Sequence, residues 1–175
     1  MNKIKIRQPN DFHHHLREGK LLNLTAKECF NRFNYVIVMP NLRLPIISIE
    51  QAKLYRSKIL NINKNGTPLM TLYLNKNIKI DDLRNFKKYS FMKGIKYYPK
   101  SATTNSTFGI SKLREVNHLI KIMEEEDIPL LIHGESIKKD VDIFDRESVF
   151  LKEELLEIMT IFPNLRIVLE HITTK

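Results

Sequence analysis

Short apolar runs alternate with amphipathic segments along the 175-residue chain. Strands that are buried on both faces of a parallel sheet read as continuous runs of apolar and branched residues. Six runs of this kind predict strands, over residues 3–7, 35–39, 68–74, 91–97, 129–133 and 166–171. Because helical segments separate them without a linker, the pattern indicates a single domain of parallel βα units.

Capping residues predict where several of the intervening helices begin. Thr25 with Glu28, and Ser48 with Gln51, each match a capping box. After Ser48, four apolar residues recur at helical spacing and predict one buried face: Ile49, Ala52, Tyr55 and Ile59. Further helices are expected to begin near Asp81, Ser111 and Asp145.

Six strands with intervening helices fit either an open doubly wound sheet or most of a (β/α)₈ barrel. In a barrel, functional side chains gather at the C-terminal ends of several strands. Here polar residues follow or end four of the apolar runs: Asn41, Lys96, His133 and His171. A doubly wound sheet usually carries a Gly-rich phosphate loop after its first strand, and this sequence has none there. The pattern therefore favours an α/β fold of the TIM-barrel type.

Composition excludes several classes of protein. With 28% charged residues, the chain has no apolar run near the ~18 residues of a membrane span, and its polar start is unlike a signal peptide. We therefore expect a cytoplasmic protein with no membrane partner. The net charge of +9 is scattered rather than gathered in a basic block, so we expect no nucleic-acid partner. The single Cys29 excludes an intrachain disulfide and a multi-cysteine zinc site.

Histidines supply the first candidate chemistry. Five of the six fall in three places, at residues 13–15, at His133 and at His171. In an extended segment alternate side chains share a face, so His13 and His15 can point together while His14 points away. Such a pair is a two-nitrogen clamp suited to Zn²⁺. The alternatives are a surface run or tag for the triplet, and ordinary packed histidines at the strand ends.

Lys96 ends a largely apolar strand, where a bare ammonium would be costly to bury. One interpretation is a lysine whose amine reaches the surface while its stem is buried. The other is a lysine carbamylated by CO₂, which replaces a cation with a carboxylate-like anion able to bridge two metal ions.

An ordered set of motifs resembles the homodimeric bacterial type of dihydroorotase, of the amidohydrolase superfamily. The motifs run through the whole chain: DFHHHLREG, VIVMPNL, GIKYYP followed by SATTNS, PLLIHGE, DIFDRE and VLEHITTK. The resemblance implies the reversible cyclisation of N-carbamoyl-L-aspartate to L-dihydroorotate plus water, in pyrimidine biosynthesis. In the ring-opening direction, a zinc-activated hydroxide attacks the cyclic amide.

The resemblance also implies a set of metal ligands. His13 and His15 would bind the more buried of two Zn²⁺ ions in each active site. His133 and His171 would bind the other ion. A CO₂-derived carbamate on Lys96 would bridge the two ions.

Four further residues match the family's substrate-binding positions. Arg17 and Asn41 would hold the substrate carboxylate, and a guanidinium suits this role because it can bind a carboxylate through two hydrogen bonds. Thr103 and Thr104 lie in the segment that matches a mobile active-site loop, where they would hydrogen-bond bound substrate. From composition alone, this segment is a Ser/Thr/Asn-rich loop.

The resemblance covers all of this chain but only part of the family pattern. The family's general acid and base is an aspartate at the end of the eighth strand, in a block resembling D-S-A-P-H, and residues 1–175 contain no such block. We assign no catalytic acid or base within the chain. Because barrels of this kind usually need ~250 residues, we expect residues 1–175 to be the N-terminal part of one barrel domain, truncated after about strand six.

Two hypotheses about function remain. In the first, the chain is part of a dihydroorotase that is a homodimer when complete, and it has little or no activity alone. In the second, it is a non-catalytic remnant or a partner subunit that needs a separate C-terminal half. A basic nucleic-acid-binding module has only the net charge in its favour.

Overall fold

The computed structural model describes residues 3–174, and its six strands form one parallel sheet in which each strand lies beside the next in the sequence. The strands are β1 (Asp11–His14), β2 (Tyr35–Val38), β3 (Thr67–Tyr73), β4 (Met92–Tyr97), β5 (Leu130–Ile132) and β6 (Ile167–Leu169). This order never reverses, as it would in a doubly wound sheet. The six strands are therefore part of a TIM-type barrel, as predicted. Within the described residues, β1 and β6 each have one neighbour.

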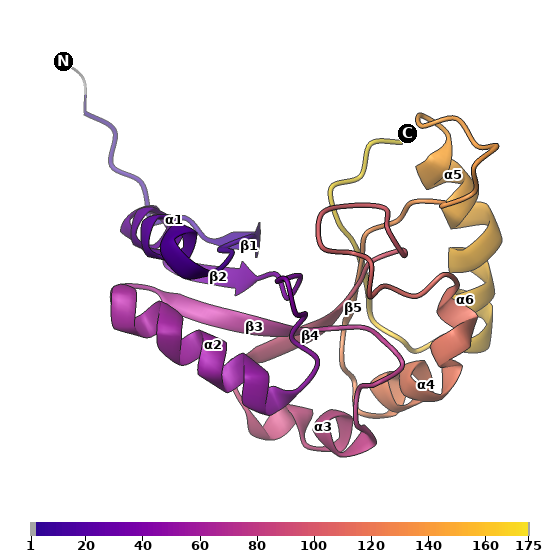
Figure 1. Ribbon diagram of the computed structural model, residues 1–175, viewed down its shortest axis with the longest axis horizontal. Coiled ribbons are helices and arrows are strands. Elements are labelled where there is room, and N and C mark those ends of the chain that lie inside the picture. The colour runs from indigo at the N-terminus through magenta and orange to yellow at the C-terminus, as the bar shows by residue number, and fades with distance from the viewer. Residues whose placement is uncertain (1–2, 175) are drawn as a thin grey trace.

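Helices lie around the outside of the strands, and the segment before β1 extends away from them (Figure 1). The helices are α1 (Gly19–Arg32), α2 (Ile49–Ile62), α3 (Ile80–Arg84), α4 (Asn117–Glu125), α5 (Arg146–Phe150) and α6 (Leu156–Ile161). Shorter turns are η1 (Phe86–Lys88), η2 (Leu113–Val116) and the π-helical η3 (Leu151–Leu155). None of the helices in residues 3–174 is long and apolar enough to cross a membrane.

Helix α2 shows how the sequence pattern produces this packing. Ser48 is its N-cap, and the Ser48 hydroxyl accepts a hydrogen bond from the Gln51 amide at 3.2 Å. The four apolar residues predicted to share one face are all buried: Ile49, Ala52, Tyr55 and Ile59. Burying a side chain of the size of isoleucine contributes about 1.5–3 kcal/mol. The predicted cap and the predicted buried face are therefore both confirmed.

The strand predicted over residues 3–7 is wrong. Residues 3–10 form no strand, and Ile4 and Ile6 are 87% and 78% exposed. An alternating pattern favours an extended chain, but a strand also needs a neighbour with which to pair, and this segment has none in the structure. The first strand instead begins at Asp11, which pairs with Val36 of β2.

The capping box predicted at Thr25 and Glu28 is also wrong. Helix α1 begins earlier, at Gly19, so Thr25 lies inside it. The Thr25 hydroxyl donates to the carbonyl of Leu21, one turn back, at 3.0 Å. Threonine makes this bond in helix interiors as readily as it caps helices, so the local sequence does not separate the two cases.

Candidate active site

The carboxyl ends of the strands bring the four predicted ligand histidines together as two pairs. Nε2 of His13 lies 3.2 Å from Nε2 of His15, and Nδ1 of His133 lies 3.1 Å from Nε2 of His171. The pairs adjoin, because the ring centroids of His13 and His171 are 5.3 Å apart. His14 points elsewhere, and its Nδ1 lies 2.7 Å from the Asp11 carboxylate. The predicted alternation along residues 13–15 is confirmed.

The spacing within each pair fits two nitrogens on one metal ion. In a tetrahedral site with Zn–N bonds of 2.0–2.1 Å, two ligand nitrogens lie about 3.3 Å apart. The His13–His15 and His133–His171 distances of 3.2 and 3.1 Å are close to this value. Across residues 3–174, however, no three His, Cys, Asp or Glu side chains form one compact metal-binding group. The site thus consists of two adjacent pairs of histidines.

In two of these histidines, a polar side chain lies next to the ring nitrogen that does not face the partner histidine. Nδ1 of His15 lies 2.8 Å from Oδ1 of Asn41, and Nε2 of His133 lies 3.1 Å from Oε1 of Glu135. A neutral imidazole carries one N–H, and an acceptor next to a ring nitrogen favours the proton there. The hydrogen bond with Asn41 leaves Nε2 of His15 as the free lone pair, on the nitrogen that faces His13. Nε2 of His133 is close to Glu135 but makes no hydrogen bond within the described residues.

The electrostatics of the site keep these imidazoles neutral. Burial, followed by the charges of Arg17 and His13, lowers the pKa of His15 to about 4. Burial, followed by the charge of Lys96, lowers the pKa of His133 to about 4, and the same two causes lower the pKa of His171. A histidine must be neutral to bind a metal, so the lowered pKa values of His15, His133 and His171 are compatible with a metal site.

Lys96 is fully buried among these histidines, so its amine does not reach the surface. Its Nζ lies 2.5 Å from Oε2 of Glu170 and 4.9 Å from the centre of the Tyr98 ring. Burial lowers the pKa of Lys96 to about 8, against the opposing effect of Glu170. A lowered pKa increases the fraction of neutral amine, which is the form that reacts with CO₂.

Glu170 is a site residue that the sequence reasoning missed. It follows β6 directly, is 9% exposed, and contacts both Lys96 and Nδ1 of His13, the latter at 3.0 Å. Burial raises its pKa, but the contact with His13 and the charge of Lys96 outweigh burial, so the pKa lies below its usual value. The signal for Glu170 was a charged residue that ends an apolar run directly before His171.

Arg17 lies in a strained backbone conformation beside the histidines. Its φ is 63°, and His171 likewise has a φ of 42°. Such conformations cost about 1–3 kcal/mol and cluster at functional sites. The Tyr55 hydroxyl donates to the Arg17 carbonyl at 2.6 Å and so helps hold this turn. Within the described residues, Nη1 of Arg17 is buried without a hydrogen-bond partner, which leaves a guanidinium nitrogen available for an anion.

Asn41 connects His15 to the loop predicted to contact substrate. Its side chain, 1% exposed, donates to the Thr104 carbonyl at 2.9 Å, and the Asn105 side chain donates to the Asn41 carbonyl at 3.0 Å. The structure therefore brings Asn41 and this loop together. The side chains of Thr103 and Thr104 are exposed, and their contact with substrate stays a prediction.

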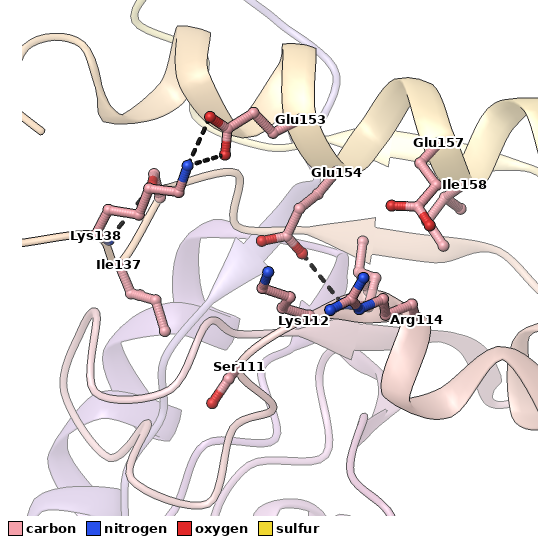
Figure 2. A pocket seen from close by; sticks show the side chains of 11 residues that line it. Ser111, Lys112, Arg114, Ile137, Lys138, Glu153, Glu154, Glu157 and Ile158 are labelled. Carbon is pink, nitrogen blue, oxygen red and sulfur yellow. Dashed lines mark hydrogen bonds and ion pairs between the residues drawn. The ribbon is translucent and has the colours of Figure 1, made fainter.

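A separate cavity lies on the helical side of the molecule, between η2 and the η3–α6 segment (Figure 2). Glu154 accepts a hydrogen bond from the Leu113 amide there at 3.1 Å, and Lys138 pairs with Glu153 at 2.5 Å. Its lining mixes both signs of charge and includes none of the histidines, so we do not assign the site to it.

Comparison with known proteins finds dihydroorotases in both sequence and structure. No family model matches the chain. A dihydroorotase of Acaryochloris marina is 43% identical over the whole chain, which spans 52% of that relative. The crystal structure of dihydroorotase from Campylobacter jejuni superimposes with a TM-score of 0.85 at 40% identity, over 96% of this chain and 49% of that one. Dihydroorotase from Saccharomyces cerevisiae, crystallised with 5-fluoroorotic acid, gives 0.86 at 30% identity, over 95% and 48%.

The chain thus spans about half the length of the curated relatives that it matches, while nearly all of it aligns with them. The predicted resemblance and the predicted barrel fold are confirmed. In sequence and in fold, the chain is similar to dihydroorotases over nearly its whole length, and this similarity fits an N-terminal half of those enzymes.

Proposed function

We propose that the chain supplies the metal-binding and carboxylate-binding part of a dihydroorotase active site. The reaction is the reversible cyclisation of N-carbamoyl-L-aspartate to L-dihydroorotate plus water, and the small-molecule substrate binds beside two Zn²⁺ ions. The observation that carries the proposal is the pairing of His13 with His15 and of His133 with His171, next to a fully buried Lys96. The names and folds of the relatives support the same reaction.

The residues of the chain would divide the metal site among them. His13 and His15 would hold one zinc ion, His133 and His171 the other, and Lys96, as its carbamate, would bridge them. Two metal ions in such a site lower the pKa of bound water and polarise the amide carbonyl. The lowered pKa values of His15, His133 and Lys96 support these assignments, because all three groups must lose or lack a proton to act as ligands.

Arg17 and Asn41 would orient the substrate. The unpaired Nη1 of Arg17 can donate to the substrate carboxylate, and a charge-assisted hydrogen bond of this kind fixes both position and orientation. Asn41 ties the loop that carries Thr103 and Thr104 to the site through the Thr104 carbonyl. The two threonine hydroxyls would then close over bound substrate and exclude water.

We assign the general acid and base to a segment outside these 175 residues. Ring opening requires the attacking water to lose a proton and the leaving ring nitrogen to gain one. The relatives are about twice as long as this chain. The general acid and base can therefore lie in the part of their sequence that this chain does not match. In this proposal the complete enzyme is a cytoplasmic homodimer.

A specific observation also favours the partner-subunit alternative. β1 and β6 each have a single neighbour among the described residues, so each offers an edge to which further strands can pair. A separately encoded C-terminal half that adds strands at these edges would complete the barrel and bring the acid and base to the site.

Coexpression tests both ideas. The zinc-loaded chain should cyclise carbamoyl aspartate weakly or not at all alone, and should gain activity with the second half of a related dihydroorotase. Lys96→Ala in the combined protein should abolish that activity. Rates by the chain alone close to those of an intact dihydroorotase would contradict the division of the site, and failure of the two halves to associate would count against the partner-subunit alternative. A chain that binds no zinc would contradict the metal assignment.

A further inference from the structure

We propose that Glu170 is a positioning residue of the metal site, which holds His13 in the tautomer that leaves Nε2 free for a metal ion. This inference rests on the proposed function, because it assigns a role toward the same site. The carboxylate contacts two of the five proposed ligands. Oε1 lies 3.0 Å from Nδ1 of His13, and Oε2 lies 2.5 Å from Nζ of Lys96.

The contact with Nδ1 decides which nitrogen of His13 carries the proton. A neutral imidazole has one N–H donor and one lone pair. The contact with Glu170 is a close charged contact without hydrogen-bond geometry. A carboxylate oxygen at this distance repels a nitrogen lone pair and attracts a hydrogen, so the ring nitrogen that faces Glu170 keeps the hydrogen. The other nitrogen, Nε2, is the one that faces Nε2 of His15 at 3.2 Å. Histidine ligands of metals commonly donate their second N–H to a carboxylate in this way, which orients the ring and increases its basicity.

The other histidines of the site show the same arrangement with different partners. Asn41 contacts Nδ1 of His15 at 2.8 Å, and Glu135 contacts Nε2 of His133 at 3.1 Å. In each case the polar side chain lies at the ring nitrogen that does not face the partner histidine. Of the three contacts, the one between His15 and Asn41 is a hydrogen bond, and those of His133 and His13 are close contacts with a carboxylate.

Glu170 is also fixed well enough to act in this way. Its backbone amide donates to the Ile132 carbonyl of β5 at 3.1 Å, and its side chain is 7% exposed. The alternative role is a simple counter-ion of Lys96. Each role uses one oxygen of the carboxylate. If Glu170 acts through His13, a substitution at Glu170 should have no effect once His13 is removed. If it acts only as a counter-ion of Lys96, the effect should remain.

Zinc affinity of the full 175-residue chain, measured by competition with a chromophoric chelator, tests the proposal. Glu170→Gln keeps one acceptor oxygen and should weaken binding about 10-fold, and Glu170→Ala should weaken it up to about 100-fold. Glu154→Gln is the matched control, because Glu154 is a half-buried carboxylate that binds the Leu113 amide and lines a cavity without histidines. In a His13→Ala background, substitution at Glu170 should cause no further loss. The proposal would be overturned if substitution at Glu170 caused an equal loss of zinc affinity in the His13→Ala background. It would also be overturned if the substitution caused no loss of affinity in the otherwise unmutated chain.

Nitrogen NMR of the unmutated, metal-free chain gives a readout that needs neither zinc nor a stable variant. Histidine labelled with ¹⁵N should show His13 with its proton on Nδ1, and Glu170→Ala should remove that preference. A proton on Nε2 of His13 in the unmutated chain contradicts the proposal. A chain that binds no zinc but shows the Nδ1–H tautomer would contradict the proposed function while supporting the role of Glu170, so the two failures are distinguishable.

Discussion

The Lys96 ammonium and the Glu170 carboxylate form an ion pair inside the barrel, with 2.5 Å between Nζ and Oε2. The side chains of Lys96 and Glu170 are 0% and 7% exposed. A buried pair gains little net stability over apolar residues of the same size, because both charges lose their hydration. Removing one partner is much more costly, because the remaining charge is buried without compensation. The pair therefore connects β4 to the end of β6 as long as both members are present.

Replacing Lys96 by methionine should destabilise the metal-free chain by roughly 3 kcal/mol, the lower end of the range for breaking a buried pair. His13 remains beside Glu170 and limits the loss. Urea unfolding in the presence of a chelator measures the change. Lys138→Met is the matched control, because the Lys138–Glu153 pair is half exposed, and exposed pairs contribute about 0–1 kcal/mol. Equal losses in the two variants would show that Lys96 is not held as a buried ion.

Stability of the metal-free chain should fall as the pH falls from about 6.5 to about 4. His15 and His133 have folded-state pKa values of about 4 and an ordinary value of 6.5. Between these values the unfolded chain binds more protons than the folded chain, so the free energy of unfolding rises with pH over this window. The stabilising effect of the neutral rings is complete above pH 6.5 and is lost as the pH approaches 4.

Urea midpoints at several pH values, measured with a chelator present, test this dependence. His133→Gln cannot titrate, so this variant should show a shallower fall between pH 6.5 and 4. His118→Gln, on the exposed face of α4, controls for the substitution itself. A fall in stability that is as steep in His133→Gln as in the unmutated chain would show that His133 does not contribute to it.

Local patterns explain why much of the fold was predictable. Strands β2 to β6 coincide with apolar runs, and α2 begins at a cap that the sequence shows directly, because these signals depend on neighbours in the chain. Residues 3–7 carried a similar local pattern but have no strand beside them. Pairing partners are a tertiary property, which the pattern does not contain.

The site also contains residues that the local sequence pattern predicts and one residue that it does not. The histidines and Lys96 stood out because polar residues at the ends of apolar runs are unusual, and the family motifs gave each a role. Glu170 did not stand out, because its contacts with His13 and Lys96 join three distant strands. It also ends an apolar run, but the family motifs gave it no role beside His171, and only the folded chain shows what the carboxylate contacts.

Replacing Gly109 by alanine should disturb the loop that carries Thr103 and Thr104. A Cβ at Gly109 would overlap the Tyr98 carbonyl oxygen and lie 3.0 Å from the Lys100 amide nitrogen. Both are backbone atoms, which cannot move aside as a flexible side chain does. Overpacking of this kind costs about 1–3 kcal/mol. Hydrogen exchange should show faster exchange in residues 99–110 of the variant than in the unmutated chain.

Gly19→Ala separates this steric effect from backbone strain. Gly19 has a φ of +59°, but a Cβ there would meet nothing within 4 Å. Its replacement should cost about 1 kcal/mol through strain alone and should leave exchange in residues 99–110 unchanged. Unchanged exchange in the Gly109 variant as well would mean that the loop accommodates the extra methyl group.

Replacing Asn41 by alanine should weaken both zinc binding and the loop. His15 loses the acceptor at Nδ1, and loss of such a partner typically lowers metal affinity 10- to 100-fold. The Thr104 carbonyl loses its donor, so amide exchange in residues 101–107 should become faster. Asn63→Ala is the control for removing a buried asparagine, because Asn63 bonds to Lys27 and Asn31 instead.

Asn41→Asp separates the two roles of this side chain. The aspartate keeps an oxygen next to Nδ1 of His15, so zinc affinity should stay within a few-fold of that of the unmutated chain. It offers no N–H to the Thr104 carbonyl, so the loop should exchange as fast as in Asn41→Ala. If the aspartate variant instead lost zinc affinity as fully as the alanine variant, while its loop stayed protected, Asn41 would act on the metal site through something other than the His15 contact.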